Sequence, residues 1–190
     1  MELLEKAKHT HVLLMHHPVL NRNGEVVTTA VTNLDIHDIS RACRTYGIGS
    51  YFIVTPIKLQ RELVENVIEH WTRGWGATYN ERRARAFDTT SVAPNFADAL
   101  AKIKEIENDD PLIVATSARA LPNAPHITWD EAVKDSRPLV LMFGTGWGMA
   151  PELLNMAKAV LPPIKGPVEY NHLSVRSAVS IALDRLFGDR

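Results

Sequence analysis

The hydrophobic pattern alternates short apolar runs with longer stretches in which apolar residues recur every three or four positions. Short runs are typical of buried strands and the three-to-four spacing of amphipathic helices, so their alternation predicts an α/β fold with a mostly parallel sheet flanked by helices. We expect strands at residues 11–17, 50–54, 112–116, 139–143 and 160–161. We expect the main helices at residues 33–46, 59–71, 96–107, 151–157 and 174–187.

Capping residues locate several helix starts. Asn33 or Asp35 can cap the first of the main helices, because a short polar side chain can accept a free N–H of the first turn. Thr128 and Glu131 have the spacing of a capping box and predict a further short helix.

Residues 74–88 contain glycines and arginines, and this composition predicts a loop or short strand.

Length and composition indicate one ordinary globular domain spanning residues 1–190. Hydrophobic residues make up 45% of the chain and charged residues 23%. The apolar runs are too short to cross a bilayer, and the first residues lack the layout of a signal peptide. Cys43 is the only cysteine, which excludes an internal disulfide and a cysteine-based zinc site, and the histidines are scattered. We therefore expect a cytoplasmic protein with no membrane partner and no metal.

The net charge of −1 argues against a protein that coats nucleic acid, but it does not exclude RNA as a substrate. Residues 81–85 read ERRAR and place Arg82, Arg83 and Arg85 close together. Such a cluster can contact phosphates, and it can equally be a solvated surface.

Three loops that follow predicted strands carry the chemistry. Residues 116–119 read TSAR, residues 144–148 read GTGWG, and residues 161–174 form a loop rich in proline and glycine that enters the last helix. In open α/β sheets ligands bind beyond the carboxyl ends of strands, so these loops together predict one pocket for a small polar ligand with an apolar portion. The glycine spacing does not match a dinucleotide fingerprint, and no Walker motif follows. Each loop also has an interpretation without a ligand. The glycines can simply form a tight turn, and Asn171 or Ser174 can simply cap the last helix.

The helix at residues 33–46 carries two arginines one turn apart. Arg41 and Arg44 share a face while Ile36, Ile39 and Cys43 face inward. At least one arginine can therefore reach the edge of a cleft, and a solvated arginine is the alternative.

These segments together resemble the SPOUT superfamily of S-adenosylmethionine-dependent RNA methyltransferases over most of the chain. Residues 32–48 look like its first motif, with the arginine at Arg41 and the closing glycine at Gly47. Residues 139–148 are similar to the second motif, and residues 170–178, YNHLSVRSA, to the third. The overall pattern is most similar to stand-alone proteins akin to the C-terminal domain of tRNA guanine methyltransferase-like proteins.

The resemblance implies a deep C-terminal trefoil knot, a homodimer, and an RNA substrate, either tRNA or rRNA, bound across the subunit interface. S-adenosylmethionine is the implied methyl donor and S-adenosylhomocysteine its product. The residues expected to hold the donor lie in the three strand-end loops: Thr116, Ser117, Ala118, Phe143, Gly144, Gly146, Gly148, Ile164, Gly166, Asn171, Leu173 and Ser174. Arg44, Arg82, Arg83 and Arg85 are expected to contact RNA.

Two positions depart from the ribose-methylating members. Asp35 stands where they carry the second asparagine of the first motif, and His172 where their third motif has asparagine. The Asn171-His172 pair is instead similar to the element of the branch that methylates guanine ring nitrogens. The target, base or ribose, therefore stays open.

Catalysis is assigned to Arg41, Asp35 and His172. Arg41 is expected to hold a phosphate or assist deprotonation, and Asp35 or His172 to act as general base. A non-catalytic module that binds a nucleotide-like ligand or a partner protein is the alternative from another class.

Overall fold

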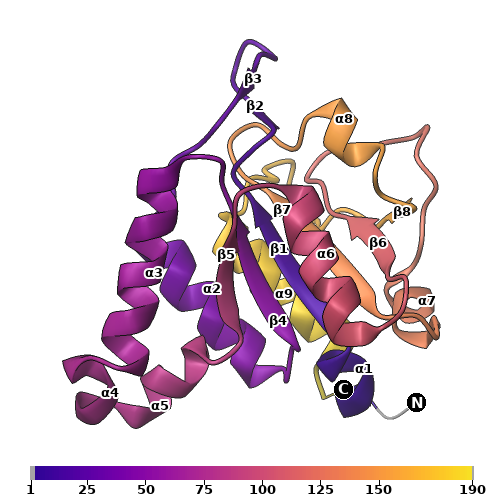
Figure 1. Ribbon diagram of the computed structural model, residues 1–190. Coiled ribbons are helices and arrows are strands. Elements are labelled where there is room, and N and C mark those ends of the chain that lie inside the picture. Colours follow the sequence, from indigo (N-terminus) through magenta and orange to yellow (C-terminus); the bar gives the residue numbers. More distant parts are fainter. Residues whose placement is uncertain (1–2, 190) are drawn as a thin grey trace.

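A computed structural model describes residues 3–189, which form a six-stranded parallel sheet with helices on both faces (Figure 1). The strand order is β5-β4-β1-β7-β6-β8, so the N-terminal strand lies in the middle of the sheet. The strands of this sheet are β1 (Thr10–Met15), β4 (Ser50–Val54), β5 (Thr90–Ala93), β6 (Leu112–Ala115), β7 (Leu139–Gly144) and β8 (Ala159–Val160). A separate antiparallel pair, β2 (Val19–Leu20) and β3 (Val26–Val27), projects from one end.

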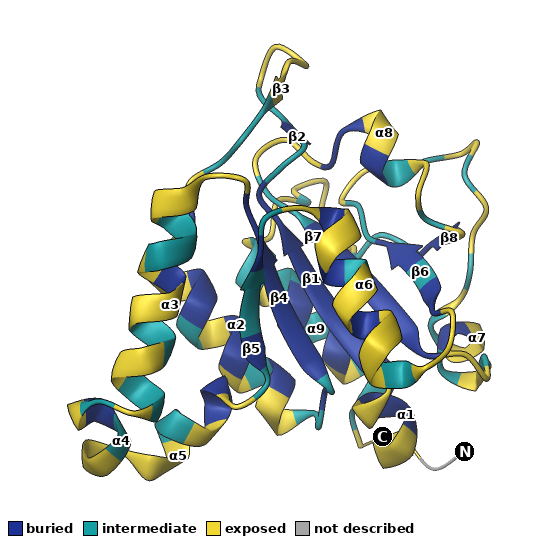
Figure 2. Ribbon diagram, viewed as in Figure 1, coloured by how far each residue is buried: buried dark blue, intermediate teal, exposed yellow. Residues whose placement is uncertain are grey.

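The helices connect the parallel strands and cover the sheet. They are α1 (Leu3–Lys8), α2 (Asn33–Thr45), α3 (Lys58–Thr72), α4 (Trp75–Tyr79), α5 (Glu81–Ala84), the 3-10 helix η1 (Arg85–Phe87), α6 (Phe96–Glu107), α7 (Trp129–Lys134), α8 (Pro151–Leu154) and α9 (Val175–Phe187). The strands of the main sheet are buried, and the helices expose their outer sides to solvent (Figure 2). No described helix is long and apolar enough to cross a membrane.

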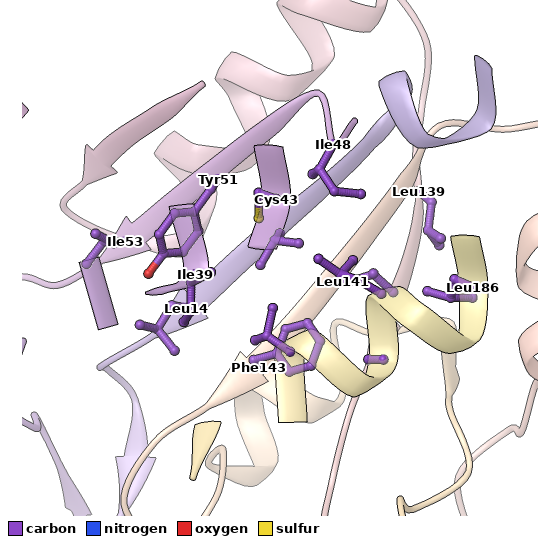
Figure 3. Close-up of a cluster of buried hydrophobic side chains, with 14 of the residues drawn as sticks. Leu14, Ile39, Cys43, Ile48, Tyr51, Ile53, Leu139, Leu141, Phe143 and Leu186 are labelled. Carbon is purple, nitrogen blue, oxygen red and sulfur yellow. The ribbon is translucent and has the colours of Figure 1, made fainter. Parts of the chain in front are cut away.

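Alternation of side chains along the central strands creates two apolar layers. In β7, Leu139, Leu141 and Phe143 face the cluster under α2 and α9 (Figure 3). Val140 and Met142 face the other way, toward α6 and α8. Because neighbouring residues of a strand point to opposite faces, a continuous apolar run is what a sheet buried on both sides requires.

The structure confirms the α/β class and the mostly parallel sheet, and it corrects several local predictions. Residues 74–88 are not a loop or strand but three short helical segments, α4, α5 and η1. The cap of α2 is neither Asn33 nor Asp35 but Thr32, whose Oγ1 accepts the N–H of Asp35. The helix expected at residues 151–157 ends at Leu154. Strand β5 and helix α1 had no counterpart among the elements expected from the hydrophobic pattern.

Candidate active site

A cleft of about 1010 Å³ lies at the carboxyl ends of β1, β6 and β7. A volume of this size accommodates a small-molecule ligand or cofactor. Its walls combine apolar side chains with backbone groups from the three strand-end loops predicted above. The cleft is thus where an open parallel sheet places its ligands.

The glycine loop after β7 is shaped by close packing. Gly146 has a φ of 58°, in the left-handed region that favours glycine, and a Cβ there would lie 2.9 Å from the carbonyl oxygen of Leu20. The same carbonyl accepts the N–H of Trp147 at 2.9 Å. A Cβ on Gly144 would lie 2.7 Å from Cγ of Met149. These glycines therefore do more than turn the chain: they bring its backbone to the cleft wall.

The other two loops are tied to each other. Thr116 donates its hydroxyl to the carbonyl oxygen of Met142 at 2.9 Å, which fixes the end of β6 against β7. Asn171 donates its side-chain amide to the carbonyl oxygen of Ala118 at 2.7 Å. Ser174 caps α9, because its Oγ accepts the N–H of Ser177. Asn171 therefore joins two walls of the cleft. Ser174 is a helix cap, as one of the two interpretations of the sequence predicts, and it also lines the cleft.

An ion pair closes the end of the cleft beside β1. Arg176 Nη1 donates to a carboxylate oxygen of Asp35 at 2.9 Å, and Thr32 donates its hydroxyl to the other oxygen at 2.6 Å. Asp35 is buried, so both partners compensate for its removal from water. His16, Thr29 and Thr145 line the same end.

The structure brings most of the predicted donor-binding residues together. All of them line the cleft except Gly166, which lies in the exposed part of the loop between β8 and α9. Asp35 and His172 line it as well. Their roles stay predictions, because geometry alone assigns a place and not a function.

The predicted arginines lie elsewhere. Arg41 and Arg44 are exposed on α2 and do not line the cleft. Arg82 and Arg83 lie on α5 and Arg85 on η1, segments that pack with α3 and α2, away from the strand ends that form the cleft (Figure 1). The guanidinium of Arg83 stands over the ring of Trp71, 4.9 Å from its centroid. Within one chain, no predicted arginine contributes to the cleft walls.

The cleft wall also contains residues that the sequence did not single out, among them His16, Thr29, Thr145, Trp147 and Arg176. Thr145 and Trp147 lie within the glycine loop, and Arg176 within the third motif, so position alone could have identified them. His16 and Thr29 belong to segments with no recognisable motif, and only the sheet topology brings them to the site.

The cleft fits S-adenosylmethionine by its chemistry. Phe143, Ile164 and Leu173 offer apolar surface, while the backbone groups near Gly144 and Ala118 offer hydrogen-bond partners. The described residues contain no cluster of three or more histidine, cysteine or acidic side chains that could hold a metal. A ligand with an apolar ring, polar edges and a charged end suits such walls.

Comparison with known proteins identifies relatives. Residues 9–188 match a family model described as SAM-dependent RNA methyltransferase. An uncharacterized protein from Aquifex aeolicus is 37% identical over 178 residues, which cover 93% of this chain and 87% of that protein. A tRNA (guanine-N(1)-)-methyltransferase from Nitratidesulfovibrio vulgaris is 39% identical over 182 residues, covering 96% of this chain.

The chain spans only 43% of that methyltransferase, so the activity in its name belongs to the whole relative and not to the matched region by itself. Among solved structures, the SpoU methyltransferase AviRb from Streptomyces viridochromogenes, in complex with AdoMet, superimposes with a TM-score of 0.59 at 11% identity. The superposition covers 93% of this chain and 56% of the AviRb chain, and at this identity it supports the fold alone. The family match agrees with the resemblance of the three sequence motifs: the chain belongs to the family of SAM-dependent RNA methyltransferases.

Proposed function

We propose that this chain transfers a methyl group from S-adenosylmethionine to a nucleotide of tRNA, and that the transfer takes place in the cleft at the ends of β1, β6 and β7. The observation that carries the proposal is the convergence of the three strand-end loops on one cleft. The choice of tRNA rests on the similarity to the tRNA (guanine-N(1)-)-methyltransferase from Nitratidesulfovibrio vulgaris. We infer that the reaction occurs in the cytoplasm and involves no membrane.

The donor supplies a methyl group on a positively charged sulfur, which a nucleophile displaces in line. The chain has to align that nucleophile and exclude water, and positioning of this kind accounts for much of the rate gain of such enzymes. The loops at residues 116–119, 144–148 and 162–174 hold the adenosine part of the donor. The end of the cleft beside β1 then receives the RNA nucleotide.

Of the two candidate bases, His172 is the better placed to take a proton. Asp35 is buried and already bound to Arg176 and Thr32, so protonating it would leave the cation without its partner. His172 is exposed at the cleft, with its ring 5.4 Å from that of Tyr170. We assign Asp35 to holding Arg176 at the site, and proton removal to His172.

We further propose a homodimer in which Arg41 acts across the interface. Arg41 lies outside its own chain's cleft, so a role in catalysis requires a second copy. The ion pair between Asp35 and Arg176 holds the starts of α2 and α9 together, and Leu34 and Leu173 are 58% and 46% exposed beside them. Exposed apolar side chains next to an active site are typical of a surface that a partner covers.

The trefoil knot is part of the same proposal. The loop between β8 and α9 contacts the loop after β6 through the bond from Asn171 to Ala118, and α9 then packs against α2 and β7. This course supports a chain end threaded through a loop. A crystal structure traced through residues 161–175 is the check, and an unthreaded trace contradicts it.

Methyl transfer tests the proposed function. Unfractionated bacterial tRNA is incubated with the protein and S-adenosylmethionine labelled in its methyl group, and the tRNA is digested to nucleosides. We expect label in one modified nucleoside, whose identity distinguishes base from ribose methylation. Donor binding without label in tRNA, or in rRNA as a second substrate, favours the non-catalytic binding module.

A mixed-dimer experiment tests the role of Arg41. Arg41→Ala is expected to bind the donor normally and to be inactive, and Gly146→Ala to bind the donor poorly. When the two variants are refolded together in equal amounts, random pairing makes half of the dimers mixed. Each mixed dimer has one complete site out of two, so the whole sample should regain about a quarter of the wild-type activity. No recovery in a sample with proven mixed dimers contradicts the proposal that Arg41 acts in trans.

A further inference from the structure

His16 has a buried ring nitrogen that nothing in the described chain satisfies. The residue is 0% exposed, immediately follows β1, and forms part of the cleft wall. Its Nε2 has no hydrogen-bond partner. Buried polar atoms of native proteins are nearly always bonded, so an unsatisfied one at a ligand cleft points to a partner that arrives with the ligand.

A chain of hydroxyl groups determines which nitrogen of His16 carries the proton. Thr145 donates its hydroxyl to the carbonyl oxygen of Met15 at 3.0 Å, and this carbonyl can only accept. The single hydrogen of Thr145 is thereby used, so Thr29 donates in the bond between the two threonine hydroxyls. Thr29 Oγ1 in turn accepts from Nδ1 of His16, 3.0 Å away.

No other assignment satisfies all three bonds with one hydrogen on each hydroxyl. The carbonyl oxygen of His16, which lies 3.5 Å from Thr29 Oγ1, already accepts the backbone N–H of Thr29 at 2.9 Å. Neutral His16 is therefore the Nδ1–H tautomer, and Nε2 presents a bare lone pair. Burial lowers the pKa of His16 to about 4, although the charge of Asp35 raises it, so the ring stays neutral near pH 7.

A bare lone pair in a buried site selects a hydrogen-bond donor, and the sheet order indicates which ligand brings it. The strand order β1-β7-β6 places His16 two strand spacings, about 10 Å, from the loop after β6 that we assign to the adenosine part of the methyl donor. His16 therefore lies at the opposite end, next to Asp35 and Arg176, where the proposed function puts the RNA nucleotide.

We propose that Nε2 of His16 accepts a hydrogen bond from an N–H or O–H group of the nucleotide that receives the methyl group. The inference rests on the proposed function and adds a residue that fixes the orientation of the substrate. Because Nε2 is shielded from solvent, side chains at the cleft wall shift when the nucleotide enters. An analogue that lacks the matching N–H or O–H leaves Nε2 unsatisfied, and sites of this kind reject such analogues strongly.

Nitrogen NMR of the histidine rings provides a direct test. In the free protein we expect Nδ1 of His16 protonated and Nε2 not. The Nε2 resonance should move upfield, as it does when a bare ring nitrogen accepts a hydrogen bond, on adding unfractionated tRNA with S-adenosylhomocysteine. A shift with S-adenosylhomocysteine alone would make His16 a donor-site residue, and a protonated Nε2 in the free protein would remove the acceptor; either result overturns the proposal.

Two substitutions distinguish the role of Nε2 as an acceptor from the role of the bond between Nδ1 and Thr29. His16→Asn can keep an N–H near the Nδ1 position for Thr29 but removes the acceptor, whereas His16→Gln reaches the Nε2 position with a carbonyl oxygen. We expect His16→Asn to lower kcat/KM for tRNA about 10- to 100-fold with an unchanged Kd for S-adenosylmethionine, and His16→Gln to stay within about 5-fold of the wild type.

The outcomes distinguish the two proposals. A wild-type protein that does not methylate RNA refutes the proposed function, and this inference with it. An active wild type with an equally active His16→Asn variant refutes the inference alone. Equal losses in both variants with lowered Tm values assign His16 to structure and also overturn it.

Discussion

Gly146→Ala tests how the glycine loop shapes the cleft. Alanine at a φ of 58° costs about 1–2 kcal/mol, because the left-handed region suits only glycine well. Its Cβ would lie 2.9 Å from the carbonyl oxygen of Leu20, which also accepts the N–H of Trp147. Weakening that hydrogen bond costs about 1 kcal/mol more. The sum, about 2–3 kcal/mol, lowers the Tm of a chain of this size by about 4–12 °C.

Two further glycines serve as controls for this variant. Gly166→Ala places its Cβ in open space, with no neighbour within 4 Å, so we expect a change within about 0.5 kcal/mol. Gly148 also has no neighbour within 4 Å, but its φ of 107° lies beyond the left-handed helical region, so Gly148→Ala reports backbone strain alone, of a larger size than at Gly146. Differential scanning calorimetry measures all three. A Gly146→Ala protein that melts with the wild type, or with Gly166→Ala, refutes the predicted loss of stability.

The remaining predictions concern pH, a buried lysine and RNA contact. Burial lowers the pKa of His16 from 6.5 to about 4, so between these values the unfolded chain binds a proton that the native chain does not. The free energy of unfolding should therefore fall by up to about 3 kcal/mol as the pH drops from 6.5 to 4. Urea titrations at several pH values should show that the free energy of unfolding of His16→Asn depends less steeply on pH. Lys6 donates to two backbone carbonyl groups just after α7 at 2.6 Å each, so Lys6→Met should cost about 2–3 kcal/mol, whereas Lys8→Met, at an exposed ion pair, should change stability by less than about 1 kcal/mol in the same titration. The double substitution of Arg82 and Arg85 by alanine should weaken tRNA binding and lower the slope of log K against log salt by about 1–2; unchanged filter-binding curves would remove these arginines from the RNA surface.

Much of the fold follows from local pattern. The strands predicted at residues 50–54 and 139–143 are short apolar runs, and the helix predicted at residues 96–107 has strong apolar periodicity. The structure has all three at these places. Strand β5 reads TSVA, too short and too polar to stand out, and its partial burial comes from packing against β4, α3 and α6. The segment at residues 74–88 contains glycines that argue against helix, yet packing against α3 and α2 forms three short helical segments.

The candidate site divides in the same way. The three strand-end loops were recognisable because glycine and small polar residues directly after an apolar run are typical of a strand end that binds a ligand. The end beside β1 was not recognisable, because His16 and Thr29 belong to no motif and meet Thr145 only in the folded chain. Asp35 was assigned as a possible base without its partner, since no local rule links it to Arg176, 141 residues later.

Titration of S-adenosylmethionine and S-adenosylhomocysteine into the pure protein by calorimetry tests the central claim most directly. We expect micromolar binding with one site per chain, weakened about tenfold or more by Gly146→Ala and unchanged by Gly166→Ala. No heat of binding from a folded protein, or equal binding by the two glycine variants, would contradict the assignment of this cleft to the methyl donor.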